Sequence, residues 1–132
     1  MRSAMANNNT DGARAEALAA TYLARHGLRV ITRNFRVRGG EIDLVCRDGA
    51  TLVFVEVRLR RNAGFGGAAA SITATKRRRL VLAARHYLAR TPEAPCRFDC
   101  VLLSGLGDSF AAGGNACDSG IEWIRDAFAA DD

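Results

Sequence analysis

The segment at residues 40–58, GEIDLVCRDGATLVFVEVR, constrains the fold more than any other part of the sequence. It holds two runs of strand-forming residues, 41–47 and 51–58, separated by Asp48-Gly49. Charged and apolar residues alternate in parts of both runs, as is typical of half-buried strands, and Asp-Gly between two such runs favours a tight hairpin. The segment therefore predicts an antiparallel pair of strands whose two faces differ in chemistry.

A two-residue loop at Asp48-Gly49 would set the register of this hairpin. The expected partners are then Arg47 with Ala50, Val45 with Leu52, Asp43 with Phe54, and Glu41 with Glu56. Because successive side chains of a strand point to opposite faces, one face receives three carboxylates and one guanidinium. These four residues are Glu41, Asp43, Glu56 and Arg58.

Three carboxylates on one sheet face repel one another unless a cation lies among them. Hard divalent cations prefer oxygen ligands, and Mg²⁺ usually binds one or two carboxylates while keeping waters for a substrate. Such an ion activates water and neutralises a scissile phosphate. The pattern therefore predicts a site for Mg²⁺ or Mn²⁺, and the alternative is a half-exposed face with solvated charges.

The remaining patterns predict one small domain. Helices are expected from Thr10 or Asp11 to about His26 and at 75–90, and further strands at 28–35, 97–103 and 121–124. The order αβββαββ predicts an α/β domain, bordering on α+β, with a mixed central sheet flanked by helices. We expect a disordered lead at 1–10, the domain at 11–128 and a short tail at 129–132; a loop at 59–73 and an insertion at 105–120 are glycine-rich.

Positive charge is concentrated in one stretch of the chain. Residues 57–91 contain nine basic and no acidic residues, so the rest of the chain carries −4 of the net charge of +5. Guanidinium groups pair with phosphate oxygens, so this stretch favours a nucleic-acid partner over a merely solvated helix face. The expected backbone contacts are Arg60, Arg61, Lys76, Arg77, Arg78 and Arg79.

Two features bear on location. The basic helix lacks aromatic anchors on its apolar face, so we expect no membrane partner. The N-terminus lacks the apolar region of a secretory signal, so we expect a cytoplasmic protein.

The spacing of Asp43 and Glu56-Val57-Arg58 resembles the PD-(D/E)xK nuclease superfamily, in which an acid precedes a strand turn and Glu-x-Lys. The wider text is similar to the YraN-like family of small bacterial proteins. The segments that carry this resemblance are GGEIDLVCRDGATLVFVEVR, FGGAAASITATKRRRL, CRFDCVLL and IEWIRDAF, and it spans nearly all of 11–128. The resemblance implies a restriction-endonuclease-like fold similar to that of archaeal Holliday-junction resolvases.

The resemblance also implies roles for individual residues. Asp43 and Glu56 match the metal-binding acids, Glu16 matches an acid on the first helix, and Glu41 is the neighbouring acid. Arg58 stands where the superfamily usually has lysine, and arginine cannot act as a base. It can still orient the nucleophile or stabilise charge in the transition state.

The resulting hypothesis is a Mg²⁺- or Mn²⁺-dependent endonuclease that hydrolyses DNA phosphodiesters, with branched or repair intermediates as suggested substrates. The alternative is a catalytically weak or inactive DNA- or RNA-binding module, or an accessory subunit of a repair complex. A homodimer is left open by the resolvase resemblance. Asp99, in RFDCV, is either a further site acid or the partner of a neighbouring arginine.

Overall fold

The computed structural model describes residues 10–60, 72–104 and 120–130, without the side chains of Thr10 and Arg60. Residues 1–9 of the lead expected at 1–10, most of the 59–73 loop and most of the 105–120 insertion lie outside these residues, as does Arg61; residue 10 already belongs to a helix. In the described part, no helix is long and apolar enough to cross a membrane.

The elements follow the predicted order αβββαββ, so the fold class is confirmed. They are α2 (Thr10–Arg25), β1 (Arg29–Val37), β2 (Gly40–Asp48), β3 (Thr51–Arg60), α3 (Ala74–Leu88), β4 (Cys96–Ser104) and β5 (Ile121–Phe128). The last strand extends beyond the predicted 121–124 because Asp126, with a φ of 53°, turns its backbone N–H toward the carboxylate of Asp99 at 2.9 Å. This bond lets the chain continue through a register shift between β4 and β5.

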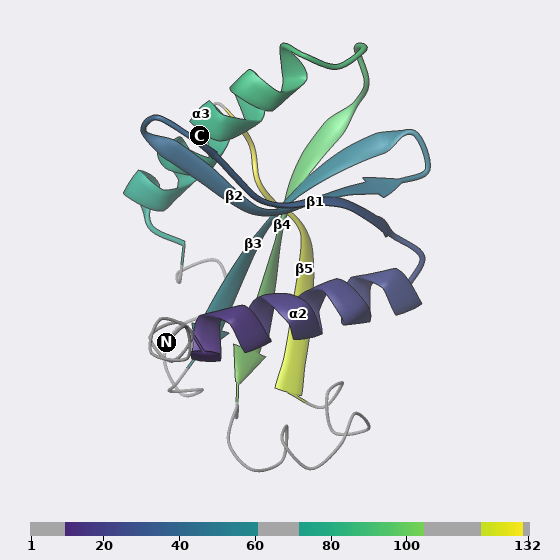
Figure 1. Cartoon of the computed structure of the whole chain (residues 1–132), viewed down its shortest axis with the longest axis vertical. Coiled ribbons are helices and arrows are strands. Elements are labelled where there is room, and N and C mark those ends of the chain that lie inside the picture. Colours follow the sequence, from purple (N-terminus) through teal and green to yellow (C-terminus); the bar gives the residue numbers. More distant parts are fainter. Residues whose placement is uncertain (1–9, 61–71, 105–119, 131–132) are drawn as a thin grey trace, which may run out of the picture.

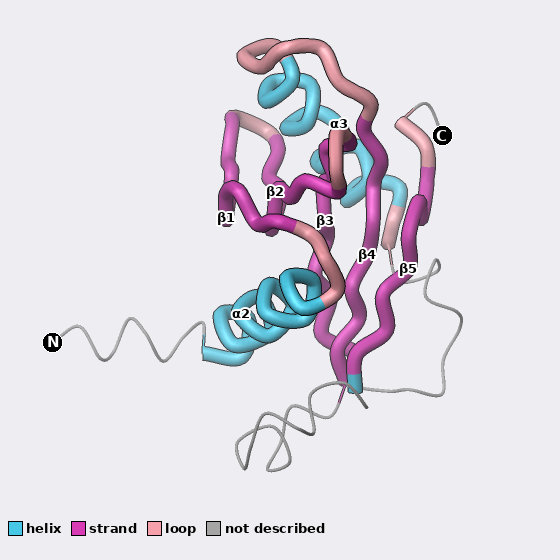
Figure 2. The backbone as a smooth tube through the Cα atoms, turned by 90° about the vertical axis from the view of Figure 1, so that its right-hand side faces the viewer, coloured by secondary structure: helices cyan, strands magenta, loops and turns pink. Residues whose placement is uncertain are grey.

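The five strands form one mixed sheet in the order β1-β2-β3-β4-β5. All neighbours are antiparallel except β3 and β4, which are parallel and joined through α3. Parallel neighbours need a long crossover connection, which a helix usually supplies. Figures 1 and 2 show α2 and α3 on opposite faces of the twisted sheet.

Each face of the sheet has its own apolar core. Along β3, Val53 and Val55 contribute to the core under α2, whereas Leu52 and Phe54 contribute to the core under α3. The alternation predicted for this strand is therefore real, with both of its faces covered in its first half. Further fully buried side chains are Leu23, Leu44 and Val101 on the α2 side and Ile42, Leu80 and Leu102 on the α3 side, all at 2% exposure or less.

The predicted register of the hairpin was wrong by two residues. Asp48 pairs with Thr51, so Gly49 and Ala50 form the loop, and Gly49 adopts the left-handed φ of 62° that favours glycine. Asp48 stays in the strand, where its Oδ2 accepts a hydrogen bond from Arg97 Nη1 on β4 at 3.0 Å. Because an error of two residues preserves the alternation, the side chains of β3 keep their predicted faces, but the predicted pairs do not hold.

Gly40 allows α3 to pack closely on β2. A Cβ atom at this position would lie 2.4 Å from the carbonyl oxygen of Arg79 and 3.1 Å from the amide nitrogen of Ala83. Real Cβ atoms do not approach backbone atoms so closely, and only glycine permits this contact. The helix is thereby held against the strand that carries Glu41 and Asp43.

Candidate metal and nucleic-acid site

A cleft of about 370 Å³ opens where β2 separates from β3. The paired residues of these strands end at Leu44 and Val55, and beyond this point β3 pairs with β4 alone. Figure 1 shows the strands diverging, with the first turns of α2 and α3 flanking the gap. We call this cavity the carboxylate cleft; its charged lining residues are Glu16, Glu41, Asp43, Glu56, Arg58 and Lys76.

Asp43 stands at the point of separation. Its Oδ2 accepts a hydrogen bond from the backbone N–H of Val57 at 2.8 Å, in place of a ladder bond between the two strands. Continuation of the observed register would place Asp43 level with Glu56, whereas the predicted register paired Asp43 with Phe54. Besides burial, the negative charge of Asp43 raises the pKa of Glu56, so the two carboxylates lie close enough to interact.

Asp43 and Glu56 both have raised pKa values, and the negative charge of Asp43 adds to the rise at Glu56. Burial is the main cause for both, and it raises the pKa of Asp43 to about 6 and that of Glu56 to about 7. The negative charges of Glu16 and Glu41 add to the shift at Asp43, and the hydrogen bond from Val57 opposes it. Such raised values mean that the pair favours either a proton or a metal cation between the two groups.

Arg58 faces the same cleft from β3. Its Nη1 lies 4.0 Å from Oε2 of Glu56, at the limit of an ion pair, and its side chain is 29% exposed. Its Nε is buried and has no hydrogen-bond partner among the described residues. A buried N–H of this kind is costly unless a ligand or water accepts from it.

Lys76 enters the cleft from the first turn of α3. Thr73 caps this helix, and its Oγ1 accepts a hydrogen bond from the Lys76 backbone N–H at 3.1 Å. The positive charge of Lys76 lowers the pKa of both Asp43 and Glu56, against the effect of burial. Sequence reasoning assigned this residue only to backbone contacts; the one available signal was that it is the single lysine of a chain with 19 basic residues.

Glu16 and Glu41 complete the cleft from two different elements. Glu16 comes from α2, and Glu41 from the start of β2. The Glu41 side chain is 48% exposed, and its Oε1 lies 3.6 Å from Nε of Arg36 on β1. Glu41 is therefore a rim residue with its own cation, less suited than Asp43 to hold a metal directly.

The basic residues predicted to contact the nucleic-acid backbone do not share one surface, because those of α3 line two different cavities. Lys76 lines the carboxylate cleft, whereas Arg77 and Arg78 line a separate cavity. Arg79 is exposed. The side chain of Arg60 and all of Arg61 lie outside the described residues.

Asp99 is a structural residue. It is fully buried and accepts hydrogen bonds from Arg97 Nε at 2.9 Å, Trp123 Nε1 at 2.9 Å and the backbone N–H of Asp126. Asp99 does not line the carboxylate cleft. The reading of Asp99 as the partner of a neighbouring arginine is the one that the structure supports.

Within the described ranges, no three His, Cys, Asp or Glu side chains are already gathered as a metal-binding group. Two carboxylates are the number that Mg²⁺ commonly takes, with waters and substrate oxygens supplying the rest.

Comparisons with known proteins identify relatives of the whole domain. The family model described as "Uncharacterised protein family UPF0102" matches residues 15–103, which include the charged residues of the cleft. A UPF0102 protein of Dechloromonas aromatica is 57% identical over 129 residues, 96% of this chain and 97% of the relative. Others, from Methylobacillus flagellatus and Nitrosospira multiformis, are 58% and 53% identical over 88% and 89% of this chain and 94% and 91% of their own lengths.

Proposed function

We propose that this chain, which belongs to the uncharacterised protein family UPF0102, is a nucleic-acid-binding protein that hydrolyses DNA phosphodiesters with a divalent metal ion. The family assignment agrees with the YraN-like resemblance of the sequence. The names of the relatives state no activity, so the proposal depends on the carboxylate cleft and on the resemblance to PD-(D/E)xK nucleases.

The observation that carries the proposal is the position of Asp43 and Glu56 at one end of a shared cleft. Among the described residues, Arg58 approaches Glu56 only to 4.0 Å, and no arginine or lysine forms an ion pair with Asp43. These two residues would hold Mg²⁺ or Mn²⁺, and Glu16 would act on them through its charge. The bound ion would supply Lewis-acid activation of water and of the scissile phosphate.

Arg58 and Lys76 would together take the two roles of the single lysine in the PD-(D/E)xK motif, contact with the phosphate and orientation of the attacking water. Arg58 keeps its charge at any working pH, and the exposed part of its guanidinium group would contact a phosphate oxygen. Lys76, which enters from α3, offers a compact ammonium group that would orient the attacking water. A lysine thus reaches the same cleft from another element and would supply the ammonium group that the motif position lacks.

DNA is the favoured substrate because of charge and resemblance together. The net charge is +5, and the start of α3 carries four consecutive basic residues beside the cleft. The mixed sheet flanked by helices is compatible with the restriction-endonuclease-like fold that the resemblance implies. Branched or repair intermediates are the substrates that similarity to Holliday-junction resolvases suggests.

The test is a cleavage assay on plasmid, single-stranded and four-way-junction DNA at low salt, with Mg²⁺, Mn²⁺ or EDTA. Wild type should cleave only with metal, and Asp43→Ala and Asp43→Asn should not cleave. The Asn variant retains an acceptor for the Val57 N–H, so its fold is preserved while the charge is lost. Asp11→Asn, exposed at the start of α2, is the matched control and should cleave normally.

Cleavage that persists in both Asp43 variants would contradict the proposed site. The second candidate function, a binding module without turnover, is favoured by the arginine at position 58. It predicts that wild type and Asp43→Asn bind DNA in a salt-sensitive way while neither cleaves. In that case Arg58→Lys is the variant to examine for restored hydrolysis.

A further inference from the structure

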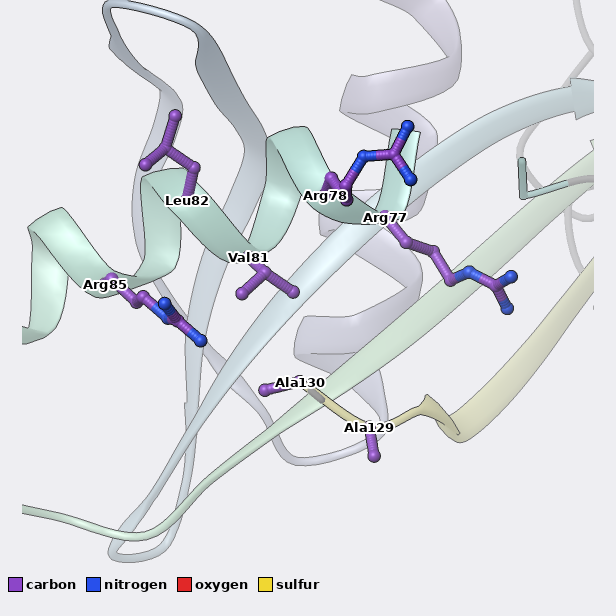
Figure 3. A pocket seen from close by; sticks show the side chains of 7 residues that line it. All are labelled: Arg77, Arg78, Val81, Leu82, Arg85, Ala129 and Ala130. Atoms are coloured by element: carbon purple, nitrogen blue, oxygen red, sulfur yellow. The ribbon is translucent and has the colours of Figure 1, made fainter. Parts of the chain in front are cut away.

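A second cavity, of about 270 Å³, lies on the outer side of α3 next to the residues that follow β5. Figure 3 shows the side chains of Arg77, Arg78 and Arg85 around it. Val81 and Leu82, which is 39% exposed, contribute its apolar part. We call this cavity the arginine hollow; no Asp or Glu is among the described residues that line it.

The helical period explains why these side chains share one side of α3. Arg77, Val81 and Arg85 are spaced four residues apart, and Arg78 and Leu82 repeat the same spacing beside them. Residues at i, i+4 and i+8 lie on one face of an α-helix. The arrangement places three positive charges around an apolar base, and the guanidinium carbon of Arg77 lies 5.9 Å from the ring centroid of Phe128.

The arginine hollow and the carboxylate cleft lie on different sides of the same helix. Lys76 lines the cleft, and the next two residues, Arg77 and Arg78, line the hollow. An α-helix with its side chains is about 10–12 Å across. The major groove of a DNA duplex is about 12 Å wide and admits one α-helix, with a phosphate backbone on each side.

We propose, on the basis of the proposed function, that the arginine hollow binds backbone phosphates of the second strand of a duplex whose first strand lies in the carboxylate cleft. Guanidinium groups bind phosphate oxygens through paired N–H donors, and Arg85 extends this surface beyond the basic run at the start of α3. The apolar base excludes water beneath the phosphates, which strengthens these contacts. An acidic protein partner is the other chemistry that three guanidinium groups suit, but it would not explain the cleft on the opposite side of the helix.

Arg85→Gln is the decisive variant, because Arg85 lies outside the carboxylate cleft. Arg33→Gln is the matched control, because it removes the same charge from an exposed position on β1. Arg33 lines a different cavity, which lies between α2 and β1. The full chain is titrated by fluorescence anisotropy with a labelled duplex, and separately with one of its strands, in EDTA so that no cleavage occurs. Thermal unfolding verifies that both variants are folded.

Arg85→Gln should bind the duplex several-fold more weakly, and the slope of log Kd against log salt should decrease by about 0.9, the loss of one phosphate contact. Binding of the single strand should be unchanged, and Arg33→Gln should match wild type on the slope. Equal weakening on duplex and single strand, or no change on either, overturns the inference. Wild type that binds no DNA at all, in which case an acidic partner would remain, also overturns it.

The inference and the proposed function can fail separately. Cleavage by wild type together with unchanged duplex binding by Arg85→Gln would refute only the role of the arginine hollow. Weakened duplex binding by Arg85→Gln without any cleavage by wild type would refute only the hydrolytic function.

Discussion

Replacement of Glu56 by Gln should stabilise the metal-free protein at neutral and alkaline pH. The Glu56 side chain is only 13% exposed, and burial followed by the negative charge of Asp43 raises its pKa from 4.5 to about 7. Between pH 4.5 and about 7, Glu56 keeps its proton in the folded chain but has released it in the unfolded chain. The free energy of unfolding therefore decreases as pH rises through this window and stays low above it.

The size of the effect follows from the shift in pKa. At 1.36 kcal/mol per pKa unit, a rise from 4.5 to about 7 corresponds to roughly 3 kcal/mol. Because part of this shift is repulsion from Asp43, which itself releases a proton as pH rises, we expect about 1–3 kcal/mol for this single substitution. Glutamine resembles the protonated acid at every pH, so the gain should be absent at about pH 4 and complete at about pH 8.

The assay is urea unfolding of wild type and Glu56→Gln in EDTA at both pH values, with the midpoint and slope fitted together. Glu93→Gln, at an exposed position after α3, is the control and should show no such gain. A variant that is no more stable than wild type at about pH 8, or equally stabilised at both pH values, would refute the electrostatic reasoning. Addition of Mn²⁺ should then stabilise wild type more than Glu56→Gln, since metal binding replaces the proton.

Three further outcomes are expected. Gly40→Ala should destabilise the fold by about 1–3 kcal/mol in urea unfolding, because its Cβ would meet the α3 backbone, whereas Gly12→Ala, with open space, should not. Asp99→Ala should lower stability by about 3–5 kcal/mol, since it removes the acceptor of the Arg97 Nε–H, the Trp123 Nε1–H and the Asp126 backbone N–H. Lys76→Met should slow cleavage while leaving the unfolding midpoint almost unchanged; an unaltered rate would contradict its role in orienting water.

The hairpin shows how far local sequence information reaches. Alternation along β2 and β3 predicted two strands and a tight turn, and the observed shift of two residues leaves every side chain of β3 on its expected face. The pairs themselves were not predictable, because Asp48 is retained in the strand by its hydrogen bond to Arg97. Arg97 is 49 residues away, and no local pattern signals that contact.

The cleft shows where local information ends. Asp43, Glu56 and Arg58 come from one hairpin, so their proximity depends on short-range geometry, and the sequence by itself determined it. The place of Lys76 in the cleft was not predicted, since it depends on how α3 docks on β2 through Gly40. Helix docking depends on close packing between residues that are distant in sequence. Only the tertiary structure therefore shows that Lys76 lines the carboxylate cleft while Arg77 and Arg78 line the arginine hollow.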